Sequence, residues 1–216
     1  NDGEWFTIWN DGRSGTATVT VTVDGKVAAT RKVTFYGDVA SLSATVVKAY
    51  IADDDTTSDV VAVTAKDADG VLVPGATITA STADAGVTGS MVDQFFVSGS
   101  FGVYHLTASA DADETGAYTY TFKSGTTVTT TAVVNVSNYL VKTATLTLDK
   151  ATYAPGEKAT LTLTLKDSNG LPVPDWTAAW WLSDTLLSSA GITQDLFANG
   201  LVTTKNGVAT ATFFMP

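Results

Sequence analysis

The stretch "ATLTLTLKDSNGLPVPD", residues 159–175, carries the signals that decide the fold. Its first seven residues place leucines on one side and threonines on the other, which is the period of a half-buried β-strand. The pair Asn169-Gly170 then supplies the positive φ angles that a tight turn requires. Val173-Pro174 is predicted to lie at the edge of a sheet, where the N–H that proline lacks is not needed.

The same alternation runs through the rest of the chain. It recurs as "ATVTVTV" at 17–23, "AYTYTF" at 117–122 and "GVATATFF" at 207–214. Threonine and valine fill these segments because β-branched side chains fit a pleated surface. No segment keeps a helical period over three turns, so the sequence predicts an all-β protein.

An internal repeat organises the chain. The phrase "KDADGVLVPG" at 66–75 returns as "KDSNGLPVPD" at 166–175, an offset of 166 − 66 = 100 residues. At this offset, residues 43–67 align with residues 143–167 without a gap. The start of the chain fits the same frame, so the sequence predicts modules of about 100 residues.

The second copy, "TLDKATYAPGEKATLTLTLKDSNGLPVPDWTAAW" at 147–180, resembles the bacterial immunoglobulin-like repeats of invasin- and intimin-type adhesins and of many surface-layer proteins. The shared pattern is a strand, Tyr-x-Pro-Gly-Glu, a Leu/Thr strand and Asp-x-x-Gly-x-Pro-Val. The resemblance implies tandem immunoglobulin-like β-sandwich modules. Similar phrases occur in macroglobulin-like domains, whose reactive thioester needs the cysteine that this chain lacks.

In this frame the chain holds pieces of three modules. Residues 1–38 are predicted to be the C-terminal part of one module, residues 39–138 a complete module, and residues 139–216 a module without its last hairpin. We therefore expect a window from a longer array. In an alternative interpretation, the hairpin of one molecule completes the sandwich of its neighbour.

The composition excludes several classes of function. The net charge is −10, which argues against binding nucleic acid or anionic lipid. The chain has no cysteine, so disulfides and thiolate metal sites are excluded. It has one histidine, His105, which we interpret as an ordinary strand residue. We expect no enzyme, no membrane insertion and no organic cofactor.

Topology predicts where acidic loops meet. The strands expected in the complete module are 44–51, 60–66, 76–81, 102–108, 117–122 and 127–136. In an immunoglobulin-like sandwich, the loops "ADDDTTSD" and "ADADETG" would share one pole and face the second phrase. Carboxylates gathered there repel one another unless they are screened or bridged.

Calcium, with six to eight oxygen ligands, is the cation that fits such a pole. The predicted metal ligands are Asp53, Asp55, Asp111, Asp113 and Asp167. The alternative is a set of solvated acidic loops. Residues 135–137, Asn-Val-Ser, form a glycosylation sequon at Asn135.

The tryptophan-rich segments are predicted mainly as core. Of Trp176, Trp180 and Trp181, one or two are expected in the core and another as an exposed anchor. The segment "EWFTIW" at 4–9 is also interpreted as a core strand, with an interface patch as the alternative.

The function predicted from these features is structural. We expect an extracellular, cell-surface subunit of a surface-layer-like envelope assembly. Its partners would be copies of itself, in a lattice or filament, and neighbouring immunoglobulin-like modules. The alternatives are the stalk of a cell-surface adhesin and an immunoglobulin-like decoration module of a phage or virion.

Overall fold

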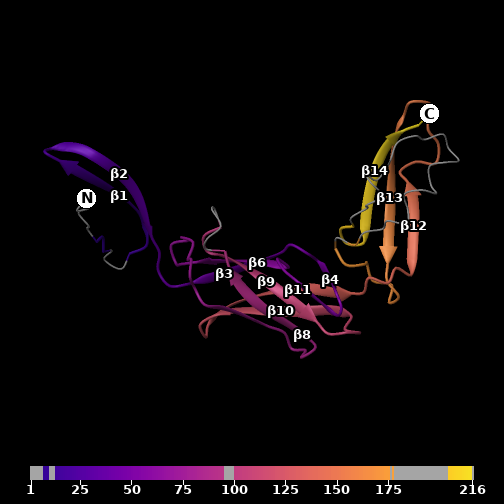
Figure 1. Cartoon of the computed structure of the whole chain (residues 1–216), viewed down its shortest axis with the longest axis horizontal. Helices are drawn as coiled ribbons and strands as arrows, with labels where there is room; N and C mark the ends of the chain where they lie inside the picture. The colour runs from indigo at the N-terminus through magenta and orange to yellow at the C-terminus, as the bar shows by residue number, and fades with distance from the viewer. Residues whose placement is uncertain (1–6, 10–12, 95–99, 176, 178–203, 216) are drawn as a thin grey trace, which may run out of the picture.

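The computed structural model describes residues 7–9, 13–94, 100–175, 177 and 204–215. The regular elements in these ranges are all β-strands, arranged in four sheets (Figure 1). The fold is therefore all-β, as the sequence predicts. In the described part of the chain there is no helix of the length and apolarity that a membrane crossing needs.

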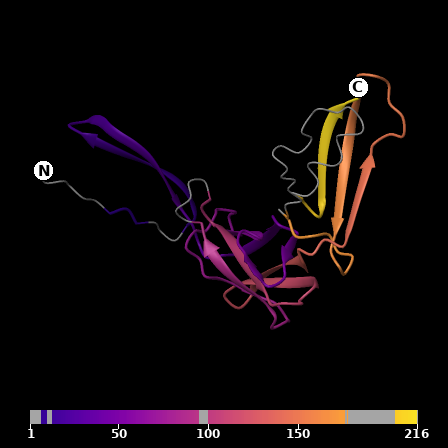
Figure 2. The ribbon, with the colours of Figure 1, turned by 45° about the vertical axis from the view of Figure 1, so that its right-hand side comes forward.

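A two-stranded hairpin comes first. It consists of β1 (Gly15–Val23) and β2 (Lys26–Phe35), joined by Asp24-Gly25. Both turn residues have positive φ, 51° and 76°, which matches the twist of a tight hairpin. The hairpin and the C-terminal sheet stand at opposite ends of the central sandwich (Figure 2).

The central unit is a sandwich of two sheets. The first sheet contains β3 (Ser41–Val46), β6 (Val61–Lys66), β9 (Val103–Ala110) and β5 (Asp55–Thr57), with β8 (Val87–Asp93) also paired to β9. The second sheet contains β4 (Tyr50–Ala52), β11 (Val128–Ser137), β10 (Gly116–Ser124) and β7 (Ile78–Ser81). The parallel pairing of β4 with β11 and the antiparallel pairing elsewhere give the immunoglobulin-like topology.

Apolar side chains from the two sheets meet in one core. Val63 and Leu106 face Tyr120, Phe122 and Val134, and all five are fully buried. The Tyr120 hydroxyl donates to the Thr88 carbonyl at 2.8 Å, so the buried phenol keeps a partner. Burial raises the pKa of Tyr120 to about 12.

Two features of this sandwich differ from the predicted strands. The strand expected at 44–51 is divided into β3 and β4, which belong to different sheets, so the chain crosses between the sheets after Val46. Strands β5 and β8 were not predicted. Gly89 interrupts the alternation of β8, and a Cβ there would lie 2.7 Å from Leu106 Cδ1.

The last unit is a three-stranded sheet. Its strands are β12 (Thr143–Leu148), β13 (Lys158–Lys166) and β14 (Val208–Phe214), in that order. One face forms a second core with Leu161, Leu163, Leu165 and Phe213 buried. The three strands repeat the order of β3, β6 and β9 in the central sandwich.

The gapless alignment of the repeat is wrong over the first strand of each copy. Ala44 lies opposite Val63, whereas Ala144 lies opposite Leu165, so the two registers differ by two residues. The connection to the next strand runs from Val46 to Val61 in the central unit and has to include β4 and β5. The division into modules itself stays a prediction.

Candidate functional site at the module junctions

Asp67, in the first phrase, closes the phrase's own turn. Its Oδ1 accepts the N–H groups of Asp69 at 3.0 Å and of Val71 at 2.8 Å. The side chain directly follows β6, and the residue is only 4% exposed. A carboxylate that binds backbone N–H groups two and four residues ahead forms an Asx-type turn, which explains an aspartate at this position.

The second oxygen of Asp67 reaches a different part of the chain. Oδ2 accepts the N–H of Gly37 at 2.9 Å, in the linker between β2 and β3. This bond and the N–H groups of Val71 and Asp69 hold the pKa of Asp67 below its usual value, although partial burial opposes them. One carboxylate therefore folds the phrase and holds the segment that arrives from the preceding unit.

Asp167 repeats this arrangement in the second phrase. Its Oδ1 accepts the N–H groups of Asn169 at 2.9 Å and Leu171 at 2.8 Å. Its Oδ2 accepts the N–H of Asn138 at 3.2 Å, in the linker between β11 and β12. Asp167 is 1% exposed. We call the bond from Asp67 or Asp167 to the preceding linker the linker clamp.

Side chains add contacts next to each linker clamp. At the first junction, the Ser14 hydroxyl donates to Asp69. At the second junction, the Asn138 amide donates to the Ser168 hydroxyl at 3.1 Å, and the Tyr139 hydroxyl donates to Asp55 Oδ2 at 3.4 Å. At both junctions a residue of the phrase, Asp69 or Ser168, thus adds a side-chain contact, and at the second junction Tyr139 adds one between the linker and β5.

Each phrase packs closely against a glycine. Gly102 and Gly207 precede β9 and β14, and their carbonyl groups accept the N–H groups of Ala65 and Leu165. A Cβ on Gly102 would lie 2.9 Å from Leu72 Cβ, and one on Gly207 would lie 2.5 Å from a carbonyl oxygen of β13. Both glycines also have positive φ, 70° and 67°, so a side chain would be strained there.

Asp175, at the end of the second phrase, connects three segments. Its Oδ2 accepts the N–H of Ala49 at 3.1 Å, and its Oδ1 accepts the N–H of Asn206 at 2.6 Å. Its own N–H donates to the carbonyl of Tyr50 at 2.9 Å. The second phrase therefore contacts the central unit at Ala49 and Tyr50, within the strand predicted at 44–51, whereas the predicted contact was with the acidic loops.

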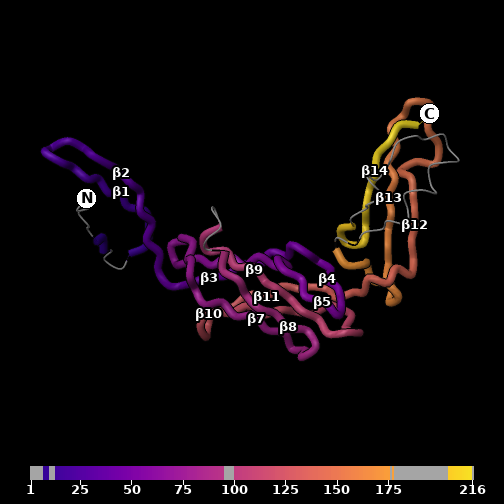
Figure 3. The backbone as a smooth tube through the Cα atoms, in the orientation of Figure 1, coloured from indigo at the N-terminus to yellow at the C-terminus, as the bar shows by residue number. Residues whose placement is uncertain are grey.

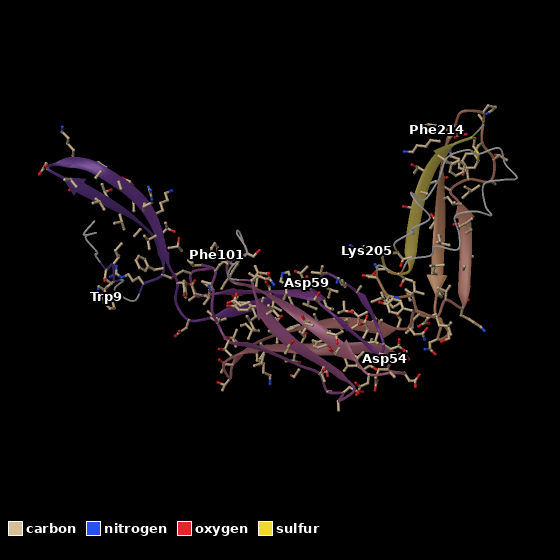
Figure 4. All side chains as sticks on the ribbon, in the orientation of Figure 1. Trp9, Asp54, Asp59, Phe101, Lys205 and Phe214 are labelled. Atoms are coloured by element: carbon tan, nitrogen blue, oxygen red, sulfur yellow. The ribbon has the colours of Figure 1, made fainter. Side chains whose placement is uncertain are left out.

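The two acidic loops meet at the predicted pole. The N–H of Asp54 donates to the carbonyl of Asp111 at 3.4 Å, which joins the loops. Figure 3 shows β4 and β5 at the end of the sandwich nearest the last sheet, and Figure 4 places Asp54 there. Burial raises the pKa of Asp53, with the negative charges of Asp113, Asp54 and Asp167 adding to it.

Three acidic residues of the pole, Asp54, Asp55 and Asp113, suit the local backbone. Asp54 and Asp113 have positive φ, 50° and 66°, a conformation that aspartate tolerates better than most residues. Asp55 Oδ1 accepts the N–H of Thr56 at 2.7 Å. Among the described residues, no three His, Cys, Asp or Glu side chains are placed so that they could hold a metal ion. Calcium binding stays a prediction.

The sequon residue Asn135 lies inside β11. Its side-chain nitrogen donates to the carbonyl of Ala49 at 3.1 Å, and the Ser137 hydroxyl is fully buried. A glycan would be attached to this same nitrogen, in place of one of its two hydrogens. Glycosylation of Asn135 stays a prediction.

The other candidate residues are His105 and the tryptophans. His105 lies on β9, as predicted, and its Nδ1 is 2.7 Å from Asp59 Oδ1, a partner that the sequence did not reveal. The prediction of core burial is wrong for Trp9, which is 86% exposed. The predictions for Trp176, Trp180 and Trp181 lie outside the described residues.

No family model matches the sequence, and no curated protein matches it. Among solved structures, the chain is similar to the Escherichia coli adhesin FdeC, with 24% identity, a TM-score of 0.44, and coverage of 94% of this chain and 66% of that chain. It is similar to domains 4–9 of the surface layer protein SbsC, with 23% identity, a TM-score of 0.37, and coverage of 73% and 24%.

A third similar structure is the Yersinia pseudotuberculosis adhesin InvE, with 22% identity, a TM-score of 0.35, and coverage of 81% of this chain and 52% of that chain. The chain spans less than two thirds of the length of each of these three structures. The chain is an all-β protein whose central sandwich has immunoglobulin-like topology, and it is similar to these bacterial adhesins and surface layer domains.

Proposed function

We propose that this chain is a structural subunit of an extracellular envelope assembly, built like a surface-layer protein from tandem immunoglobulin-like modules. The observation that carries the proposal is the linker clamp. Asp67 and Asp167 hold Gly37 and Asn138 in the same way at two successive junctions. The linker clamp at both junctions fixes how consecutive units are placed. A structural chain depends on that placement.

The linker clamp suits this role because it is buried and directional. Each carboxylate accepts N–H groups from its own turn and from the linker, and hydrogen bonds to an ionised acceptor are stronger than those between neutral groups. Asp67 and Asp167 are both less than 5% exposed, so water competes poorly for these bonds. Folding of the phrase therefore also orients the preceding linker.

The composition supports an extracellular setting. The chain carries twenty-two acidic and twelve basic residues and no cysteine, which suits a soluble surface that depends on no redox state. The resemblance to the adhesin and surface-layer repeats points the same way. In this proposal the partners are copies of the chain and neighbouring modules, and the role is not catalytic.

Electron microscopy and sedimentation of the purified chain test the proposal. A two-dimensional lattice or a filament, held by contacts between copies, supports a surface-layer-like assembly. A monomeric rod would contradict the assembly and favour the stalk of an adhesin. Decoration of isolated virions by the chain would instead favour the phage module.

A further inference from the structure

Asp175 makes contacts that folding of the second phrase does not require. The corresponding position in the first phrase is Gly75, and that phrase nevertheless forms the same turn. The N–H of Val73 bonds to the Ala65 carbonyl, and the N–H of Val173 bonds to the Leu165 carbonyl. The carboxylate at position 175 is therefore not needed to build the turn.

The partners of Asp175 explain its presence better. Its carboxylate and its N–H bind Ala49 and Tyr50, which belong to the segment where the central sandwich crosses between its two sheets. By contrast, the N–H of Gly75 bonds to Asp93 Oδ2 at 3.0 Å, within its own unit. The same position thus faces the neighbouring unit in one phrase and its own unit in the other.

Asp175 also connects the segment of Ala49 and Tyr50 to the last sheet. Its Oδ1 accepts the N–H of Asn206, in the turn before β14. The residue is 9% exposed, and each carboxylate oxygen accepts a backbone N–H. One side chain therefore connects a backbone N–H of the central unit to a backbone N–H of the last unit.

We infer that Asp175 is a positioning residue that locks the second junction, beside the linker clamp of Asp167. The linker clamp holds Asn138, in the covalent connection, whereas Asp175 holds Ala49, on the segment that pairs with β11 at Asn135. An attachment outside the covalent connection restricts rotation about that connection, and the Asp175 carboxylate supplies the side-chain part of this attachment. The inference concerns the junction alone and holds for an envelope layer and for a stalk.

Double electron–electron resonance between spin labels measures this restriction directly. The chain has no cysteine, so Thr119→Cys and Thr210→Cys introduce labels at unique sites. Both threonines are exposed, on β10 of the central unit and on β14 of the last unit. The test variant is Asp175→Ala, which removes both acceptor oxygens and leaves the bond from the backbone N–H of residue 175 to the Tyr50 carbonyl.

Thr177→Ala is the matched control. The Thr177 hydroxyl donates to the Pro174 carbonyl at 2.6 Å, in the same loop but within the last unit. Amide chemical shifts of β13 and β14 report whether the last unit remains folded. If Asp175→Ala unfolds it, Ala49→Pro removes the donor from the other side of the junction.

We expect a narrow distance distribution in the parent chain and in Thr177→Ala. Asp175→Ala, or Ala49→Pro, should widen the distribution at least twofold while the chemical shifts of β14 remain those of a folded sheet. An unchanged width in a variant whose last unit is folded would overturn the inference. A distribution that is already broad in the parent chain would also overturn it.

Discussion

Asp167 Oδ2 lies 3.2 Å from the backbone nitrogen of Asn138, twenty-nine residues earlier in the chain, and accepts its N–H. The same carboxylate closes the turn at Asn169 and Leu171 through its other oxygen. The turn of the second phrase and the placement of the central sandwich thus both depend on the Asp167 side chain. Its effect on the free energy of unfolding and its effect on the junction can be measured separately.

Asp167→Ala should destabilise the last unit. The change leaves three backbone N–H groups without their acceptor, in a site where the residue is 1% exposed. We expect a loss of about 2–4 kcal/mol in the free energy of unfolding, since unsatisfied buried donors cost about 1–3 kcal/mol each and some of these will find water. Urea unfolding followed by tyrosine fluorescence measures the loss, and an effect below about 0.5 kcal/mol would contradict it.

Gly102→Ala should destabilise the central sandwich. The added methyl group would lie 2.9 Å from Leu72 Cβ and from the backbone nitrogen of Val73, at a residue whose φ is 70°. Overpacking and the positive φ together predict a cost of about 2–4 kcal/mol. Gly125→Ala is the control, since its φ is 61° but no heavy atom lies within 4 Å of the new Cβ. Equal losses in the two variants would show that packing against the phrase is unimportant.

Acid should weaken the first junction through Asp67. Because the pKa of Asp67 is lower in the folded chain than its usual value, the carboxylate contributes stability above about pH 4. That contribution is lost as the pH falls through the folded pKa. Asp67→Asn removes the titrating group, so stability should fall less steeply between about pH 5 and pH 2 than in the parent chain. Parallel curves for the two chains would contradict the prediction.

Calcium should stabilise the chain through the acidic pole. Burial and the charges of Asp113, Asp54 and Asp167 raise the pKa of Asp53, and a bound cation would relieve the repulsion among these groups. The calcium hypothesis predicts a higher melting temperature with calcium than with chelator. Asp53→Asn should reduce that difference. An unchanged melting temperature, with no metal bound in calorimetry, would leave solvated acidic loops as the explanation.

Much of the fold could be predicted because its signals are local. Alternation located most of the strands, Asp-Gly and Asn-Gly pairs located turns, and the repeat at offset 100 located the phrases. Strand β8 was missed because Gly89 breaks its alternation to admit Leu106 and Tyr120. The crossing from β3 to β4 was missed because the residues between these strands, Val-Lys-Ala at 47–49, include none of the usual turn residues.

The site was predictable only in part. Topology placed the acidic loops against the second phrase, since loop positions follow from strand order. The linker clamp could not be predicted, because its donors at Gly37 and Asn138 are backbone N–H groups, which every residue but proline offers. A usable signal did exist: an aspartate directly after the strand in both phrases, two residues before Gly-containing turns, is typical of a capped turn.

Amide hydrogen exchange tests the central claim, that Asp67 and Asp167 hold the preceding linkers, most directly. Asp67→Asn and Asp167→Asn keep an oxygen for the turn but place an amide N–H₂ where the linker N–H needs an acceptor. We predict that Gly37 and Asn138 are protected in the parent chain and exchange at least tenfold faster in these variants, while Val71 and Leu171 stay protected. Unprotected Gly37 and Asn138 amides in the parent chain would contradict the account.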